Sequence, residues 1–186
     1  MRYPEGHKEA VRASIVKNAS RALRRDGISG VSIPALMKKA GLTHGGFYAH
    51  FKNRDELVAA AVLSAADETG AAVLSSASGD LQGTLSSYLS KEHAEHPERG
   101  CVIAALGGEG RRQPAVVRRA FAHAARGFIR LVASRLQGDE PASGEPSNEA
   151  LRLASQMIGA VVLARLVDEP ALSARLLEAA KSPPRE

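Results

Sequence analysis

Apolar residues recur at helical spacing in nearly every segment of this chain, and no segment keeps the two-residue alternation of a strand for long. Val11, Ile15, Ala19 and Leu23, for example, share one face of a helix expected over residues 8–25. Trp is absent, and aromatic residues make up only 4% of the sequence. Since β-sandwiches and barrels need β-branched and aromatic runs, the sequence predicts an all-α protein packed through small side chains.

Four helices are expected in the first part of the chain. After residues 8–25, Ser32 caps a second short helix, and Thr43 caps a third that reaches about His50. Asn53, with Glu56 three residues on in capping-box position, begins a long fourth helix reaching about Ala77. Five further helices are expected at about 80–95, 101–110, 114–137, 148–168 and 171–181.

Positive charge gathers in the N-terminal segment. Residues 1–54 contain eleven Lys and Arg and three acidic residues, a net charge of +8. The remainder contains fourteen basic and seventeen acidic residues, a net charge of −3. This asymmetry favours a polyanion as partner of the first segment, although a solvated basic surface would have the same balance.

The single cysteine, Cys101, excludes an intrachain disulfide framework and fits a reducing compartment. The first residues lack the apolar stretch of a signal peptide. No apolar run is expected to approach the roughly 20 residues that span a bilayer. A soluble cytoplasmic protein without membrane contact is therefore predicted.

The most specific pattern lies between Ser32 and Leu57. Two short helices joined by a three-residue turn that begins with Gly41 form a helix-turn-helix pattern. Because the second helix of this motif, which Thr43 caps, is too short to be stable alone, its neighbours must hold it. Its polar outer face then stays free to enter the major groove of DNA.

Residues 8–63 resemble the DNA-binding domain of the TetR family of repressors. The residues that carry the resemblance are Gly41-Leu42, Phe47-Tyr48, His50-Phe51, Lys52-Asn53-Arg54 and Glu56-Leu57. The resemblance implies a helix-turn-helix domain over residues 1–54 and a helical ligand-binding and dimerisation domain over 55–186. It also implies a dimeric regulator, most simply a repressor, that a small molecule or electrophile releases from a palindromic operator, without catalysis or cofactor.

The same resemblance indicates which residues meet DNA. Tyr48 and His50 fall where the family contacts phosphates, and Lys52 lies beside a helix N-terminus that favours a phosphate. The residues expected at the DNA are Ser32, Thr43, His44, Gly45, Tyr48, His50 and Lys52.

Gly45-Gly46 departs from the commoner pattern of the family. Two glycines in a short helix cost roughly 1 kcal/mol each in helix propensity. They allow either close approach to DNA or a solvent-facing position that tolerates small residues. Without bulky side chains there, more of the discrimination falls to DNA shape.

The last two helices are expected to form a dimer interface. Their small and apolar residues would allow a four-helix bundle across a two-fold axis, although both helices could instead pack only within their own chain. The residues expected at the interface are Leu151, Ser155, Ile158, Gly159, Val162, Leu166, Leu172 and Leu176.

A ligand pocket is expected among the helices near residues 80–130. Its candidate wall residues are Tyr88, Cys101, Leu106, Phe121 and Phe128. Cys101 follows Arg99-Gly100 at a helix start, where the helix N-terminus and an arginine would stabilise a thiolate. Family members that sense electrophiles have a cysteine in a similar Gly-Cys setting, so sensing and a role as a small buried side chain are both open.

Two other classes of function compete with this interpretation. An enzyme with a DNA-binding appendage would use Cys101 as nucleophile and His93 or His96 as base. A non-specific architectural DNA-binding protein would explain the basic charge alone. A metal site at His93 and His96 is not expected, because Pro97 and Gly100 make this segment a loop.

Overall fold

The computed structural model describes residues 6–74, 80–138 and 144–182, and these residues form helices and connections without a strand. The all-α prediction is confirmed. The first elements are α1 (His7–Asp26), α2 (Ile33–Lys39), the 3₁₀ helix η1 (His44–Ala49) and α3 (Arg54–Leu74). The later ones are α4 (Leu81–Tyr88), α5 (Lys91–Glu95), the 3₁₀ helix η2 (Pro97–Arg99), α6 (Val102–Gly110), α7 (Ala115–Gln137), α8 (Asn148–Leu166) and α9 (Pro170–Ala179).

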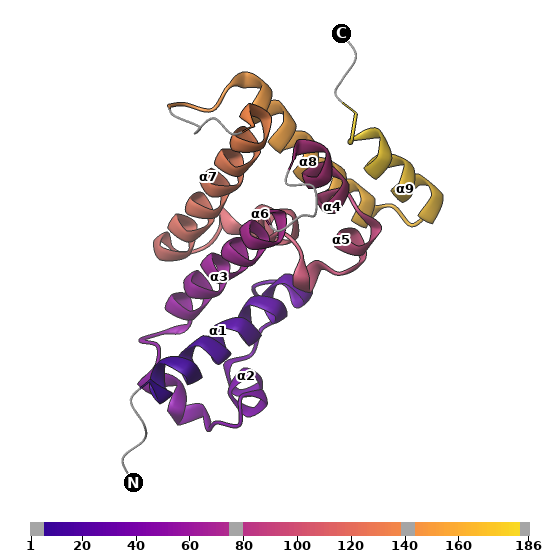
Figure 1. The fold of residues 1–186 in the computed structure, drawn as a ribbon. Helices are drawn as coiled ribbons and strands as arrows, with labels where there is room; N and C mark the ends of the chain where they lie inside the picture. The colour runs from indigo at the N-terminus through magenta and orange to yellow at the C-terminus, as the bar shows by residue number, and fades with distance from the viewer. Residues whose placement is uncertain (1–5, 75–79, 139–143, 183–186) are drawn as a thin grey trace.

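The molecule is elongated, with α1 and α2 at one end and α8 and α9 toward the other (Figure 1). The predicted long fourth helix is α3, which packs against α1 on the N-terminal side and against α7 on the other. The predicted end of this helix, residues 75–77, lies outside the described residues. Through these contacts α3 belongs physically to both parts of the chain.

The single helix predicted over 80–95 is wrong. It is divided into α4 and α5 at Leu89 and Ser90. The hydroxyl of Ser90 accepts a 3.1 Å hydrogen bond from the main-chain N–H of His93 and so starts a new helix. The change of direction brings His93 back toward the start of α6.

Two hydrophobic cores hold the fold. The first contains the inner faces of α1, α2, η1 and α3, and it continues into α6 and α7 through Val102, Leu106, Val117 and Phe121. The second joins α4, α5, α8 and α9 to the later part of α7. The N-terminal module therefore shares its core with α6 and α7.

The expectation that no apolar segment is long enough to span a bilayer is also wrong. Among the described residues, α3 meets that criterion of length and composition with 21 residues. Its apolar side chains have another explanation, because Leu57, Val62 and Ala65 are buried against neighbouring helices. An interior helix of this kind is apolar on more than one face.

Candidate nucleic-acid interface and ligand cavity

The helix-turn-helix motif exposes a polar surface at the N-terminal end of the molecule (Figure 1). In its turn, Gly41 has a φ of +73°, which glycine adopts at little cost. The residues after the turn, Thr43, His44 and Gly45, are exposed, and Tyr48 is 66% exposed. These residues thus lie where a partner can reach them.

The recognition element is a six-residue 3₁₀ helix instead of an α-helix. Thr43 caps it as predicted, since its hydroxyl accepts a 3.3 Å hydrogen bond from the N–H of Gly46. The glycines at 45 and 46 lower the propensity for a longer helix, and 3₁₀ helices occur as such short pieces. A Cβ added at Gly45 would meet no atom within 4 Å, so packing within the chain does not require glycine there.

Two phenylalanines fasten this short element from the inside. Phe47 and Phe51 are 2% and 1% exposed, and their rings stack with centroids 5.5 Å apart. Tyr48 meets Phe47 edge-on at 5.3 Å and remains largely exposed. The tyrosine hydroxyl is therefore presented on a rigid support.

The start of α3 differs from the expected phosphate site. Asn53 accepts a 2.9 Å hydrogen bond from the N–H of Glu56, which confirms the predicted cap. The Glu56 carboxylate accepts a 2.8 Å bond from the N–H of Lys52 and lies 3.6 Å from Arg12. The Glu56 carboxylate thus already uses the N–H of Lys52, and a phosphate contact from Lys52 has to use its ammonium group.

His50 and Ser32 border the exposed surface. His50 is half-buried, and burial, followed by the charges of Lys8 and Arg12, lowers its pKa. Its Nδ1 atom is buried and has no hydrogen-bond partner in the described part of the chain. Ser32 is exposed at the start of α2, and its side chain makes no capping hydrogen bond, so its hydroxyl can meet a phosphate.

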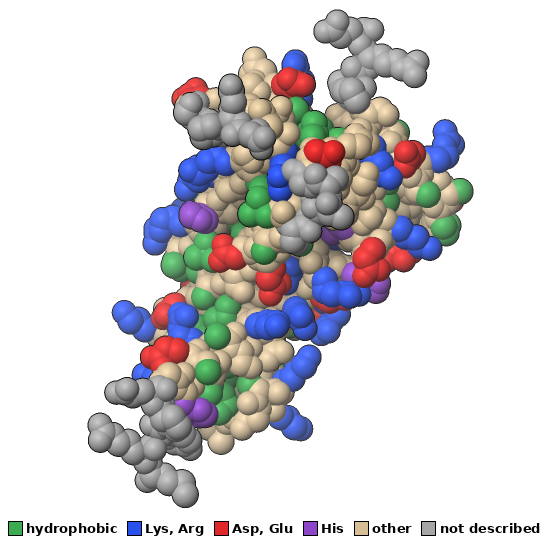
Figure 2. Space-filling view, viewed as in Figure 1, with side chains coloured by type: hydrophobic (Ala, Val, Ile, Leu, Met, Phe, Trp, Pro, Cys, Tyr) green, Lys and Arg blue, Asp and Glu red, His purple; other side chains and the backbone are tan. Residues whose placement is uncertain are grey.

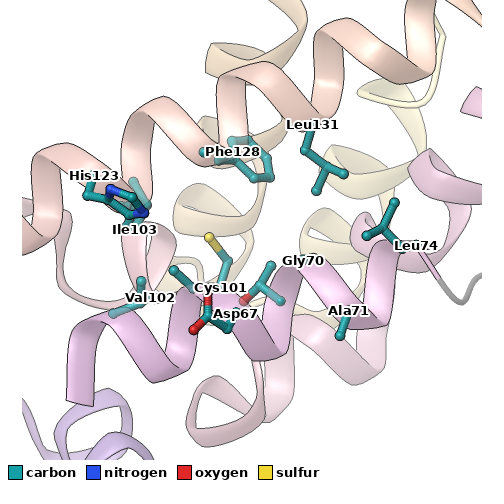
Figure 3. A pocket seen from close by; sticks show the side chains of 14 residues that line it. Asp67, Gly70, Ala71, Leu74, Cys101, Val102, Ile103, His123, Phe128 and Leu131 are labelled. Atoms are coloured by element: carbon teal, nitrogen blue, oxygen red, sulfur yellow. The ribbon is translucent and has the colours of Figure 1, made fainter. Parts of the chain in front are cut away.

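A cavity of about 410 Å³ lies between α3, the start of α6 and α7 (Figure 3). Its walls are mostly apolar, and Asp67, Thr69, Cys101 and His123 are the polar residues that line it. The sulfur of Cys101 points into the space below Phe128. The volume falls in the range of small-molecule pockets, roughly 300–1,000 Å³.

The predicted pocket residues have different locations. Cys101 and Phe128 line this cavity. Tyr88 lies behind it, with its ring 5.1 Å from that of Phe128. Phe121 lines a second cavity of about 270 Å³, and Leu106 is buried in the first core. The role of all five as ligand contacts remains a prediction.

The hydrogen bonds of His93 argue against an enzyme that uses it as a base. Nε2 of His93 accepts a 2.9 Å hydrogen bond from the main-chain N–H of Cys101, and Nδ1 lies 2.6 Å from the carbonyl oxygen of Tyr88. Burial lowers the pKa of His93 to about 4. Since both ring nitrogens are engaged, neither can take the thiol proton. His96 contacts the carboxylates of Glu92 and Glu98 instead.

Two hydrogen-bond donors near Cys101 lack an acceptor. The hydroxyl of Tyr88 is buried without a partner in the described residues, and burial, then the neighbouring Cys101, raises its pKa. Arg165 donates to the carbonyl oxygens of Ala94 and His93 at 3.1 and 2.8 Å, but its Nη1 is buried without a partner there. A buried donor without an acceptor costs free energy, so these two groups lower the stability of the folded chain.

Both ends of α6 are tied to the N-terminal module. Arg24 of α1 donates a 2.7 Å hydrogen bond to the carbonyl oxygen of Gly100, just before α6. Near the other end of α6, the carboxylate of Glu109 accepts a 3.1 Å bond from the N–H of Ile28.

No group of three or more His, Cys, Asp or Glu residues within the described ranges could hold a metal ion.

Residues 15–61 match the family described as bacterial regulatory proteins, tetR family. The match covers the later part of α1, all of α2 and η1, and the start of α3, which together form the helix-turn-helix module. The chain carries a TetR-family DNA-binding domain at these residues. No curated protein sequence matches it.

Solved structures show that the likeness in fold extends over more than nine tenths of the chain. A TetR-family regulator from Cytophaga hutchinsonii aligns with a TM-score of 0.76 at 17% identity, covering 97% of this chain and 95% of that one. The reduced form of NemR from E. coli aligns at 0.72 with 22% identity, covering 92% and 93%. A TetR regulator from Chloroflexus aurantiacus aligns at 0.66 with 26% identity, covering 94% and 91%.

The expected dimer residues on α8 and α9 all lie at least partly on the surface. Leu166 is 75% exposed, Leu151 41% and Leu172 38%, and Ser155, Ile158, Gly159, Val162 and Leu176 are exposed or half-buried. Leu163, which was not singled out, is 50% exposed on the same helix. Whether these residues meet a second subunit remains a prediction.

Asp67, His123 and Arg24 were not found by sequence reasoning. Each belongs to a helix whose polar residues look equally solvated in the sequence. The only local signal was a glycine in the middle of two of these helices, Gly70 in α3 and Gly127 in α7, and both line the cavity. Glycine inside a helix costs about 1 kcal/mol relative to Ala, which points to a role for the space it leaves.

Proposed function

We propose that this TetR-family protein is a transcriptional repressor that binds a palindromic operator as a homodimer and leaves it when an effector occupies the cavity. One observation carries the proposal. The helices around the cavity, α3, α6 and α7, also contribute to the core of the helix-turn-helix module. An effector that moves these helices therefore acts on the module, and with it on the spacing of two recognition elements.

DNA contact would use the exposed face of the module. Tyr48, His50, Ser32 and the ammonium group of Lys52 supply phosphate contacts, and the segment from Thr43 enters the major groove. The glycines at 45 and 46 offer no side chains to the bases. Discrimination would thus depend strongly on the shape of the operator.

Dimerisation would use α8 and α9. Leu166 and Leu163, which are 75% and 50% exposed, support this assignment because burial between subunits would remove them from water. A Cβ added at Gly159 would meet no atom of its own chain within 4 Å, so a neighbouring helix can approach closely there. Two copies of the chain would then place their two recognition elements at the spacing of the two operator half-sites.

Release has two chemical routes, a non-covalent effector and an electrophile that reacts with Cys101. The sulfur lines the cavity, although the residue is only 2% exposed. With iodoacetamide as probe, an S–C bond would form, iodide would leave and the thiol proton would pass to water. The adduct would fill the cavity beside the peptide group that Arg24 holds.

Selection of bound sequences from a random DNA pool tests the DNA-binding part. An enriched palindrome supports an operator-binding dimer. Binding that random DNA competes away equally well would instead identify an architectural protein. The selected operator is then used to measure release by iodoacetamide in the native chain and in Cys101→Ser. Equal release from both would remove the thiol from the mechanism.

Effector binding and operator binding must weaken each other by the same factor if release is allosteric. Such coupling typically amounts to about 1–3 kcal/mol. An effector found by screening is therefore titrated with and without operator. Equal affinity in the two titrations contradicts allosteric release. Because a regulator of this kind binds chromosomal DNA, the proposed place of action is the cytoplasm. The matching family and the similar solved structure from Cytophaga hutchinsonii are both described as regulators, which favours a protein without catalytic activity.

A further inference from the structure

The lining of the cavity defines the kind of molecule that can enter it. Its long walls are the apolar faces of α3 and α7, which carry Leu74, Phe128 and Leu131 (Figure 3). A glycine lies in each wall, Gly70 and Gly127, and a Cβ added at either would meet no atom within 4 Å. The space between the helices is therefore open to the body of an apolar ligand.

Four polar residues line this space, and two of them, Thr69 and Cys101, are unsuited to bind an ion. The hydroxyl of Thr69 donates a 2.9 Å hydrogen bond to the carbonyl oxygen of Ala65 in its own helix. The Cys101 thiol is a weak donor and acceptor. His123 projects from α7, on the opposite side of the cavity from Asp67 of α3 (Figure 3).

Asp67 is the remaining polar residue of the lining. It is exposed at the cavity and makes no hydrogen bond or ion pair in the described part of the chain. An ionised carboxylate is an acceptor with room for several donors. Across from it, the ring of Phe128 offers an aromatic face, to which a cation is attracted. Both groups favour a positive charge on the ligand.

Basic residues also occur on α7, but they belong to its outer face. Arg119, Arg126 and Arg130 are exposed, and Figure 2 shows basic side chains along the flank of this helix. None of the three lines the cavity. At physiological ionic strength, salt screens exposed charges beyond about 8 Å. These arginines therefore contribute little to the electrostatic potential inside the cavity.

We propose that the cavity binds a cationic amphiphile, with an apolar body between α3 and α7 and an ammonium group at the Asp67 carboxylate. The proposal rests on the proposed function only in taking the cavity as the effector site. The inferred ligand is therefore a hydrophobic amine, and an acid with the same apolar body would bind less well.

Three probes with one ring system test the sign of the charge. They are 2-naphthylmethylamine, 2-naphthylmethanol and 2-naphthoate, and their affinity for the native chain is measured by calorimetry without DNA. The amine is expected to bind roughly tenfold more tightly than the carboxylate, with the alcohol between them. Equal affinities, a preference for the carboxylate, or no binding of the amine would overturn the proposal.

Two pairs of variants locate the site. Asp67→Asn should weaken the amine about three- to fivefold and leave the alcohol unchanged, whereas Glu149→Gln, at an exposed carboxylate on α8, should change neither. Gly127→Leu should fill the cavity and abolish binding of all three probes. Gly108→Leu, at an exposed glycine of α6 outside the cavity lining, is its control. An amine preference that survives in Asp67→Asn would contradict the assignment.

The binding test and the release test can fail separately. If the amine binds in an Asp67-dependent way but leaves operator affinity unchanged, the ligand class stands and effector release by this site fails. If operator binding is confirmed while the probes show no charge preference, the repressor stands and this inference fails. Circular dichroism of each variant confirms that a loss of binding does not reflect unfolding.

Discussion

Arg24 donates a 2.7 Å hydrogen bond from Nη1 to the carbonyl oxygen of Gly100, although 76 positions separate them in the sequence. The N–H of the same peptide group belongs to Cys101 and donates to Nε2 of His93 at 2.9 Å. One peptide group is therefore held by α1 of the DNA-binding module on one side and by α5 on the other. Because Cys101 lines the cavity, a change there reaches α1 through a single residue.

Replacement of Arg24 should therefore be costly. Its side chain is fully buried, and Nη2 also pairs with the Glu68 carboxylate at 2.6 Å. Arg24→Met would leave the carbonyl oxygen of Gly100 without its donor, and we expect a loss of about 2–3 kcal/mol in the free energy of unfolding. Urea unfolding measures it. The adjacent Arg25→Met, at an exposed side chain, should show no loss, and equal effects of the two would contradict the structural role of Arg24.

Acid should weaken the fold through His93. Burial lowers its pKa from 6.5 to about 4, so between these values the unfolded chain binds more protons than the folded chain. The stabilisation is therefore complete above about pH 6.5 and is lost as the pH falls toward 4, by about 2–3 kcal/mol in total. Urea unfolding at pH 7 and pH 5 measures the slope. His93→Gln should flatten it, while His123→Gln, at an exposed imidazole, should not.

Removal of the Tyr88 hydroxyl should stabilise the protein. The hydroxyl is buried without a hydrogen-bond partner in the described residues, so the folded state bears its desolvation cost. Tyr88→Phe should raise the free energy of unfolding by about 1 kcal/mol. Tyr48→Phe, at a tyrosine that is 66% exposed, should leave stability unchanged and weaken operator binding. A loss of stability in Tyr88→Phe would show that the hydroxyl has a partner.

Two glycines of the motif should respond differently to alanine. Gly41 has a φ of +73°, where a Cβ costs roughly 1–2 kcal/mol. Gly45 has no such conformation, and an added Cβ would meet no atom there within 4 Å. Thermal unfolding should therefore show a lower midpoint for Gly41→Ala and an unchanged or higher one for Gly45→Ala. The reverse order would contradict the turn described here.

A charge at Gly159 should separate the proposed dimer. Gly159→Asp would bury an unpaired carboxylate between subunits, at a cost of several kcal/mol, about 3–5. Sedimentation should then detect folded monomers, and tight operator binding should be lost. Gly108→Asp, at an exposed glycine of α6 where an added Cβ would meet no atom within 4 Å, is the matched control. A fully dimeric Gly159→Asp protein would place the interface elsewhere.

Local sequence determined the helical content and the helix-turn-helix module. Each signal that predicted them depends on residues only a few positions apart. These signals are the helical periodicity, the cap at Asn53, the turn at Gly41 and the aromatic pair Phe47 and Phe51. Such short-range signals can be read along the chain. The recognition element was placed correctly, although its 3₁₀ geometry followed from a balance between two glycines and the packing beneath them.

Only the tertiary structure decided where the cavity lies and which groups face it. Cys101, Asp67 and Phe128 come from three segments, and their meeting depends on how α3, α6 and α7 pack. The buried position of Arg24 likewise depends on Gly100 and Glu68, which are 76 and 44 residues away. A charged residue in a helix looks solvated until the packing of distant elements surrounds it. Long-range packing, rather than local propensity, therefore created the cavity and its connection to the DNA-binding module.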